Sequence, residues 1–156
     1  MKKVLVAYFS LTGKTEKMAE YIAEGVRFSG NEATVKKISD YKKAEDLNGY
    51  DGYLFGCATY FQDVAEPMRT FLFLARKADL KGKLAGAFGS FLHDVGYASG
   101  AQSTSVITDT MQYIYKMETF GLGPLKLKEP VIDTPEGMRT CQDWGKVFGE
   151  QLSTRA

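Results

Sequence analysis

Short apolar runs alternate with segments of helical periodicity along the whole sequence. This alternation is typical of a parallel β-sheet covered by helices on both faces, because each parallel strand needs a crossover that carries the chain back. The apolar runs predict strands over residues 3–9, 32–38, 52–57, 84–89 and 119–127, the last broken by Gly121, Gly123 and Pro124. Apolar spacings of three and four residues predict helices over 14–28, 66–75, 99–117 and 134–152. We therefore expect an α/β fold with a doubly wound five-stranded parallel sheet in the order 2-1-3-4-5.

Length and composition favour a single domain over residues 1–156, since 44% of these residues are hydrophobic and can form one core. The 20 basic and 19 acidic residues are mixed along the chain, so nucleic acid is not an indicated partner. Cys57 and Cys141 are far apart and predict two buried thiols rather than a disulfide. No apolar stretch approaches the ~20 residues of a membrane span. These features predict a cytoplasmic protein without a membrane partner.

The stretch from residue 4 to residue 17 carries the strongest functional signal. An apolar run stops abruptly at Ser10, Thr12 and Thr15, and a helix is predicted to begin near Lys14. The hydroxyls, the backbone N–H groups around Gly13 and the positive end of the helix would all face one anion. This loop is therefore predicted to bind phosphate.

Spacing separates the kinds of phosphate loop that this stretch could form. A nucleoside-triphosphate loop needs a glycine where this chain has Tyr8, and a dinucleotide fingerprint needs three glycines where this loop has one. The remaining pattern, S-x-T-G-x-T, suits a single terminal monophosphate. An ordinary helix start, with Thr12 as the cap and Glu16 in the first turn, is the structural alternative.

Three loops should meet at the carboxyl edge of the predicted sheet, beside the point where the strand order reverses. They are residues 10–15, 58–63 and 90–98. The second contains the adjacent aromatics Tyr60 and Phe61, and the third combines Phe91 and Tyr97 with several glycines. A phosphate-binding loop between two aromatic, amide-rich walls suits a flat heteroaromatic ring with a phosphorylated side chain, and FMN has that shape.

At these loops the chain resembles the flavodoxin-like FMN-binding flavoproteins, which include the flavodoxins, the flavodoxin-like quinone reductases and the flavodoxin domain of the diiron flavoproteins. The similarity rests on S-x-T-G-x-T at 10–15, on Ala-Thr-Tyr-Phe at 58–61 and on Leu-Ala-Gly-Ala-Phe-Gly-Ser-Phe at 84–91. It implies FMN as the cofactor, with a phosphate site, one edge or stacking wall, and a cover over the other side of the ring. The residues implied are Ser10, Leu11, Thr12, Gly13, Lys14 and Thr15 for the phosphate, Ala58, Thr59, Tyr60 and Phe61 for the first wall, and Ser90, Phe91, Gly96 and Tyr97 for the cover.

Two departures from the family pattern bear on function. Lys14 stands where flavodoxins commonly carry asparagine, which adds positive charge near the phosphate and could also draw a dinucleotide phosphate. The formal net charge is +1, whereas small electron-carrier flavodoxins are typically strongly acidic. No metal ligands and no catalytic residue are assigned, and the roles of His93 and Cys57 stay open.

The resemblance leaves three functions in view. The first is FMN-based electron transfer to a redox partner protein. The second is an NAD(P)H-dependent quinone or FMN oxidoreductase, in which a nicotinamide cofactor and a quinone are the partners and a homo-oligomer completes the pocket; no dinucleotide motif is evident for it. The third is a non-redox anion-binding or regulatory module on the same fold.

Overall fold

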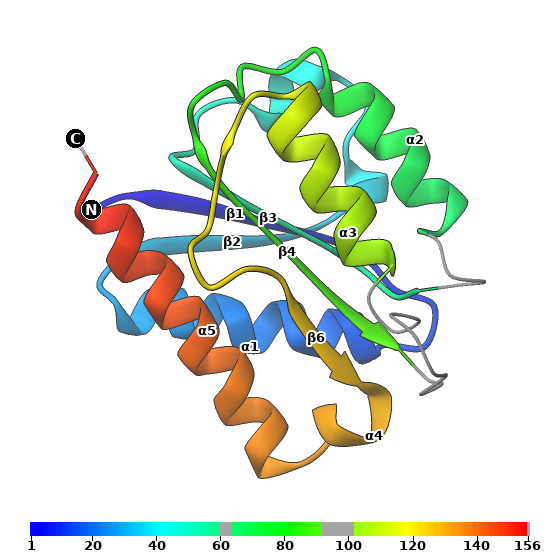
Figure 1. Ribbon diagram of the computed structural model, residues 1–156, viewed down its shortest axis with the longest axis vertical. Coiled ribbons are helices and arrows are strands. Elements are labelled where there is room, and N and C mark those ends of the chain that lie inside the picture. Colours follow the sequence, from blue (N-terminus) through cyan, green and yellow to red (C-terminus); the bar gives the residue numbers. More distant parts are fainter. Residues whose placement is uncertain (60–63, 92–101, 156) are drawn as a thin grey trace.

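A parallel sheet separates two layers of helices in the computed structural model, which describes residues 1–59, 64–91 and 102–155 (Figure 1). The sheet order is β2-β1-β3-β4-β5, and a sixth strand, β6, also pairs with β4. All recorded pairings are parallel. The strands are β1 (Lys3–Phe9), β2 (Glu32–Lys37), β3 (Gly52–Cys57), β4 (Leu84–Phe91), β5 (Glu118–Thr119) and β6 (Leu125–Lys128). The predicted fold and strand order are confirmed, with one strand added.

The additional strand arises because the predicted fifth strand is interrupted. β5 pairs with the start of β4 and β6 with its end, and the chain leaves the sheet between them. Gly123 adopts a φ of +78°, which favours glycine, and its carbonyl accepts a hydrogen bond of 3.1 Å from Trp144 Nε1. Pairing with β6 also continues β4 through Ser90 and Phe91, beyond the predicted end at residue 89.

The helices form two groups on opposite faces of the sheet (Figure 1). α1 (Lys14–Phe28), the short α4 (Glu129–Ile132) and α5 (Pro135–Ser153) cover one face, and α2 (Glu66–Ala75) and α3 (Gln102–Asp109) cover the other. α3 continues into one π-helical turn, Thr110–Ile114. The helix predicted to reach residue 117 ends earlier because Lys116, with a φ of +58°, turns the chain towards β5. Its predicted start at residue 99 lies outside the described residues.

Two short 3₁₀ helices, Ile38–Asp40 and Ala44–Leu47, connect β2 to β3. β2 ends one residue before its predicted end because Ile38 already belongs to the first of them. In the part of the chain that the structure describes, no helix has the length and apolar character needed to cross a bilayer.

The hydrophobic core consists of two clusters, one on each face of the sheet. Phe55, Met68 and Phe71 belong to the cluster under α2 and α3, whereas Trp144 and Phe148 belong to the cluster under α1 and α5. The two cysteines are divided in the same way. Cys57 lies in the first cluster and Cys141 in the second, and both are free and buried. The prediction of two unpaired buried thiols is confirmed, since the sheet separates them.

Candidate functional site

The first loop, residues 10–15, comprises the turn that follows β1 and the first two residues of α1. Gly13 is the N-cap residue and has a φ of +88°. Its N–H donates to Ser10 Oγ at 2.9 Å, and its carbonyl accepts from the N–H of Lys17 at 3.0 Å. The loop is thus closed by its own serine and its glycine, and it leads directly into a helix of 15 residues.

Within the described residues, no side chain caps α1. By contrast, α5 is capped by Thr134, whose Oγ1 accepts from the N–H of Gly137 at 3.0 Å. The first N–H groups of a helix have no partner inside the helix. Thr12 is therefore not the cap of α1, although Glu16 does lie in the first turn as the alternative expects, and the first N–H groups of α1 have no capping side chain.

The end of β4 lies directly beside the start of α1. Thr15 Oγ1 and Ser90 Oγ are 2.9 Å apart, and both residues are buried. The Thr15 hydroxyl therefore ties α1 to β4, while its backbone N–H stays in the first turn of the helix. Among the residues of the predicted site, this pair joins the first loop to the third.

The second loop is joined to the same place. The N–H of Thr59 donates to the carbonyl of Ser90 at 3.0 Å, and Thr59 Oγ1 donates to Ser103 Oγ at 2.9 Å. Ser103 Oγ in turn donates to the carbonyl of Cys57 at 2.9 Å. Ser103 is fully buried at the start of α3. It was not predicted as a site residue, and the only signal for it in the sequence is the run of hydroxyl residues at 103–105.

The predicted site is therefore assembled at one edge of the sheet as far as the structure describes it. The first loop, the end of β3 and the end of β4 meet there. Ala58 is buried after β3, and Phe91 is half-buried at the end of β4. Four predicted site residues and one histidine lie outside the described residues: Tyr60, Phe61, Gly96, Tyr97 and His93.

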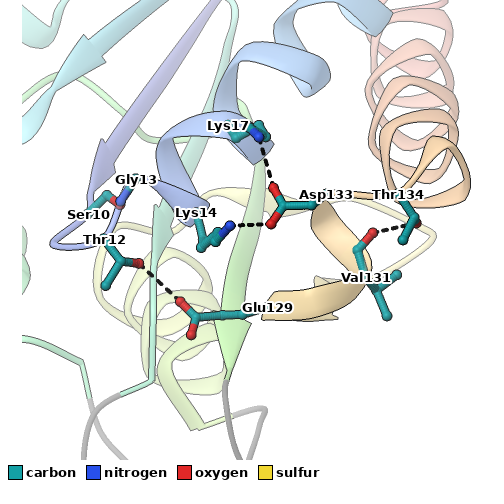
Figure 2. A network of polar contacts seen from close by, with 9 residues as sticks. All are labelled: Ser10, Thr12, Gly13, Lys14, Lys17, Glu129, Val131, Asp133 and Thr134. Carbon is teal, nitrogen blue, oxygen red and sulfur yellow. Dashed lines mark hydrogen bonds and ion pairs between the residues drawn. The ribbon is translucent and has the colours of Figure 1, made fainter.

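Charged side chains from the far end of the sequence also reach the first loop (Figure 2). Lys14 and Lys17 both donate to the carboxylate of Asp133, and the distance from Lys17 Nζ to Asp133 Oδ1 is 2.8 Å. Hydrogen bonds from Lys14 and then from Lys17 hold the pKa of Asp133 below its usual value. Thr12 Oγ1 donates to Glu129 Oε1 at 3.1 Å. Neither acidic residue could be singled out from the sequence, because nothing local links them to a loop more than a hundred positions away.

Tyr8, near the end of β1, and Glu16, in the first turn of α1, lie next to the same loop. The Tyr8 hydroxyl donates to the Glu16 carboxylate, and burial, followed by this hydrogen bond, raises the pKa of Tyr8 above its usual value. Tyr8 is therefore a neutral donor at physiological pH. A cavity of about 910 Å³ adjoins the loop here and extends towards α2, with Lys37, Tyr41 and Phe71 among its lining residues. The loop is accessible from this side.

Comparison with known proteins agrees with this geometry. The Flavodoxin family model matches residues 6–104, more than half of the chain. A flavodoxin from Maridesulfovibrio salexigens is 39% identical over 104 residues, which cover 65% of this chain and 71% of that protein. An NAD(P)H dehydrogenase (quinone) from Sinorhizobium fredii is 33% identical over 126 residues, which cover 69% of this chain but only 63% of that longer protein.

Among solved structures, oxidised Flavodoxin 1 from Bacillus cereus superposes with a TM-score of 0.80 at 27% identity, and the match covers 99% of each chain. Its fold agrees with the sheet order and helical layers described above. The family model spans the first loop, the end of β3 and β4, which are the segments that build the candidate site. This chain belongs to the flavodoxin family.

Proposed function

We propose that this protein binds FMN at the carboxyl edge of the sheet and transfers electrons through it. The observation that carries the proposal is the uncapped start of α1 behind a loop of hydroxyls, beside the ends of β3 and β4. Membership of the flavodoxin family supports it. Bound FMN would supply the redox chemistry, and the protein would supply position and electrostatics.

The donors of the first loop fit a single phosphate group. The first-turn N–H groups of α1 have no capping side chain among the described residues, and the Ser10 and Thr12 hydroxyls lie in the same loop. Only one helix start and one glycine are present, so the loop suits a monophosphate better than a pyrophosphate. In this proposal Lys14 and Thr15 contribute their backbone N–H groups, and Leu11, which is 70% exposed, borders the site.

The remaining site residues would enclose the ring. Ala58 and Thr59 follow β3, and Ser90 and Phe91 end β4, so their backbones border the place where a flat ring would lie. We assign stacking and cover to the aromatics and glycine of the two adjoining loops. These are Tyr60 and Phe61 in the second loop and Gly96 and Tyr97 in the third.

Titration of flavin-free protein with FMN tests the proposal. We expect one-to-one quenching of flavin fluorescence as the ring becomes enclosed, and weaker binding of riboflavin, which lacks the phosphate. The absence of FMN binding would overturn the assignment.

A matched pair of glycine variants shows whether the first loop is responsible. Gly13 and Gly30 stand at the two ends of α1 with φ of +88° and +90°, and an added Cβ would meet nothing within 4 Å at either position. Alanine at either position carries the same backbone strain, about 1–2 kcal/mol. We expect Gly13→Ala to weaken FMN binding roughly tenfold, as this strain predicts, and Gly30→Ala to leave it unchanged. Equal effects would locate the phosphate elsewhere.

A quinone reductase is the second candidate, favoured by the relative from Sinorhizobium fredii. It predicts that the FMN-loaded protein alone oxidises a nicotinamide cofactor when a quinone is present, and that it forms a homo-oligomer. Turnover in this assay would favour the enzyme. Reduction without turnover to quinone would favour an electron carrier that needs a redox partner protein.

A further inference from the structure

Glu129 and Asp133, here called the carboxylate pair, lie beside the first loop because of the register of β6. This strand pairs with the end of β4, with Lys128 opposite Phe91, so the residue that follows lies at the carboxyl edge of the sheet. α4 begins there, and Asp133 immediately precedes the capping residue of α5. Two contacts then cross from this segment to the first loop (Figure 2).

The two carboxylates have different partners. Asp133 faces the ammonium groups of both Lys14 and Lys17. In the described part of the chain, the polar contact of the Glu129 carboxylate is with the hydroxyl of Thr12. The positive charge of Lys14 is thus paired with the negative charge of Asp133. The Glu129 carboxylate, by contrast, is hydrogen-bonded to the neutral hydroxyl of Thr12.

The Thr12 hydroxyl has a single proton and can donate to only one acceptor at a time. If it donates to a bound phosphate, the Glu129 carboxylate loses its hydrogen bond and is left close to a second anion. If it stays with Glu129, the phosphate loses a donor. Either outcome opposes negative charge at this end of the loop, and the opposition grows with the negative charge that the ligand places there.

We propose that Glu129 is a specificity-determining residue that restricts the first loop to a single terminal phosphate. The inference rests on the proposed FMN site and assigns part of its selectivity for a monophosphate to a residue that lies outside the family's loop motif. Asp133 complements it, because its pairing with Lys14 and Lys17 removes positive charge that would otherwise attract a second phosphate.

Substitution of Glu129 by glutamine tests this with little change in shape. We expect Glu129→Gln to tighten FMN binding roughly tenfold, the size of one charge repulsion a few ångströms away in a partly aqueous site. Riboflavin, which carries no phosphate, should not change. Equal changes for riboflavin and FMN would show a structural effect and would overturn the proposal, as would unchanged or weaker FMN binding.

Glu150→Gln is the matched control. Glu150 is exposed on α5, next to Gly149, whose carbonyl accepts from Asn31 just before the start of β2. This is the opposite edge of the sheet, so the control changes the net charge equally without touching the loop. If both variants tighten FMN equally, net charge is the cause and the role of Glu129 is refuted.

A thermal-shift series with inorganic pyrophosphate separates failure of this inference from failure of the FMN site. Pyrophosphate should stabilise flavin-free Glu129→Gln more than the wild type, because a ligand that binds the folded state raises its stability. If the wild type binds no FMN but this difference is observed, the proposed function falls and the role of Glu129 stands. If pyrophosphate protects neither protein, or both equally, the inference falls even when FMN binds.

Discussion

Gly89 lies where β3, β4 and α3 come into contact. An added Cβ would lie 2.4 Å from the Cys57 carbonyl oxygen and 3.0 Å from Ser103 Oγ, distances at which the backbone must move. We expect Gly89→Ala to lower the free energy of unfolding by about 1–3 kcal/mol, the usual cost of overpacking. Because Ser103 also accepts from Thr59, FMN binding should weaken as well.

Urea denaturation of flavin-free protein measures this effect. Gly121→Ala is the control, since its Cβ would make an ordinary contact of 3.5 Å with Gln151 Oε1. A loss of stability that is the same for both variants would mean that the close approach at Gly89 is unimportant.

At the scale of single residues, the sequence could predict what depends on local pattern. Ser10, Thr12 and Gly13 form one loop between a strand and a helix, and their grouping follows from adjacency. Ser103, Glu129 and Asp133 could not be predicted, because each acts across the fold on a loop distant in sequence. The contact between the Thr15 and Ser90 hydroxyls could not be predicted for the same reason.

α1 and α5 pack with their backbones in close contact, and two glycines make this possible. A Cβ at Gly145 would lie 2.1 Å from the Ile22 carbonyl oxygen, and one at Gly25 would lie 1.9 Å from the Gln142 carbonyl oxygen. Neither obstacle is a flexible side chain, so the helices would have to separate. The first loop leads into α1 and the carboxylate pair precedes α5, so this packing also positions the site.

We expect Gly145→Ala to destabilise the protein by about 3 kcal/mol. Alanine favours a helix over glycine by about 1 kcal/mol, so a net loss would isolate the steric effect. Chemical denaturation followed by circular dichroism measures it, with Lys146→Ala, at an exposed neighbour, as the control. A gain in stability would show that the helices can move apart without cost.

Helices with a long periodic pattern were predictable, ends included, whereas the ends of elements that depend on strand pairing or on a backbone turn were not. α1, α2 and α5 agree with their predicted ranges to within one residue because regular apolar spacing defines them. β4 runs past its predicted end because β6 pairs with it, and such pairing is a property of the folded sheet. The helix after the third loop ends early at a backbone turn around Lys116, which no side-chain pattern marks.

On the scale of the whole molecule, both core clusters share one sheet. β3 contributes Phe55 and Cys57 to one cluster and Leu54 to the other, so neither layer can lose its packing without disturbing strands that support its neighbour. This arrangement supports the prediction that the chain forms a single cooperative domain.

The two cysteines report on the two layers separately and can test that cooperativity. Burial raises the pKa of the Cys141 thiol to about 12, so in the native protein at pH 8 it stays protonated and unreactive. After unfolding its pKa returns to about 8.5, and the thiolate becomes available to an alkylating reagent. Because the folded pKa is the higher one, the contribution of Cys141 to stability is complete below about pH 8.5 and declines as the pH rises above it.

We therefore expect Cys57 and Cys141 to become reactive at the same denaturant concentration. Pulsed alkylation followed by mass spectrometry measures the labelling of each cysteine. The fluorescence of Trp144 should change at that same concentration. FMN at a hundred times its Kd should move both labelling transitions by the same amount, about 2.7 kcal/mol, because a ligand of the folded state stabilises the whole cooperative unit. If Cys57 reacts first, the layer under α2 and α3 opens alone and the single-domain prediction fails. If FMN protects only Cys57, the site stabilises its own edge of the sheet without being coupled to the layer under α1 and α5.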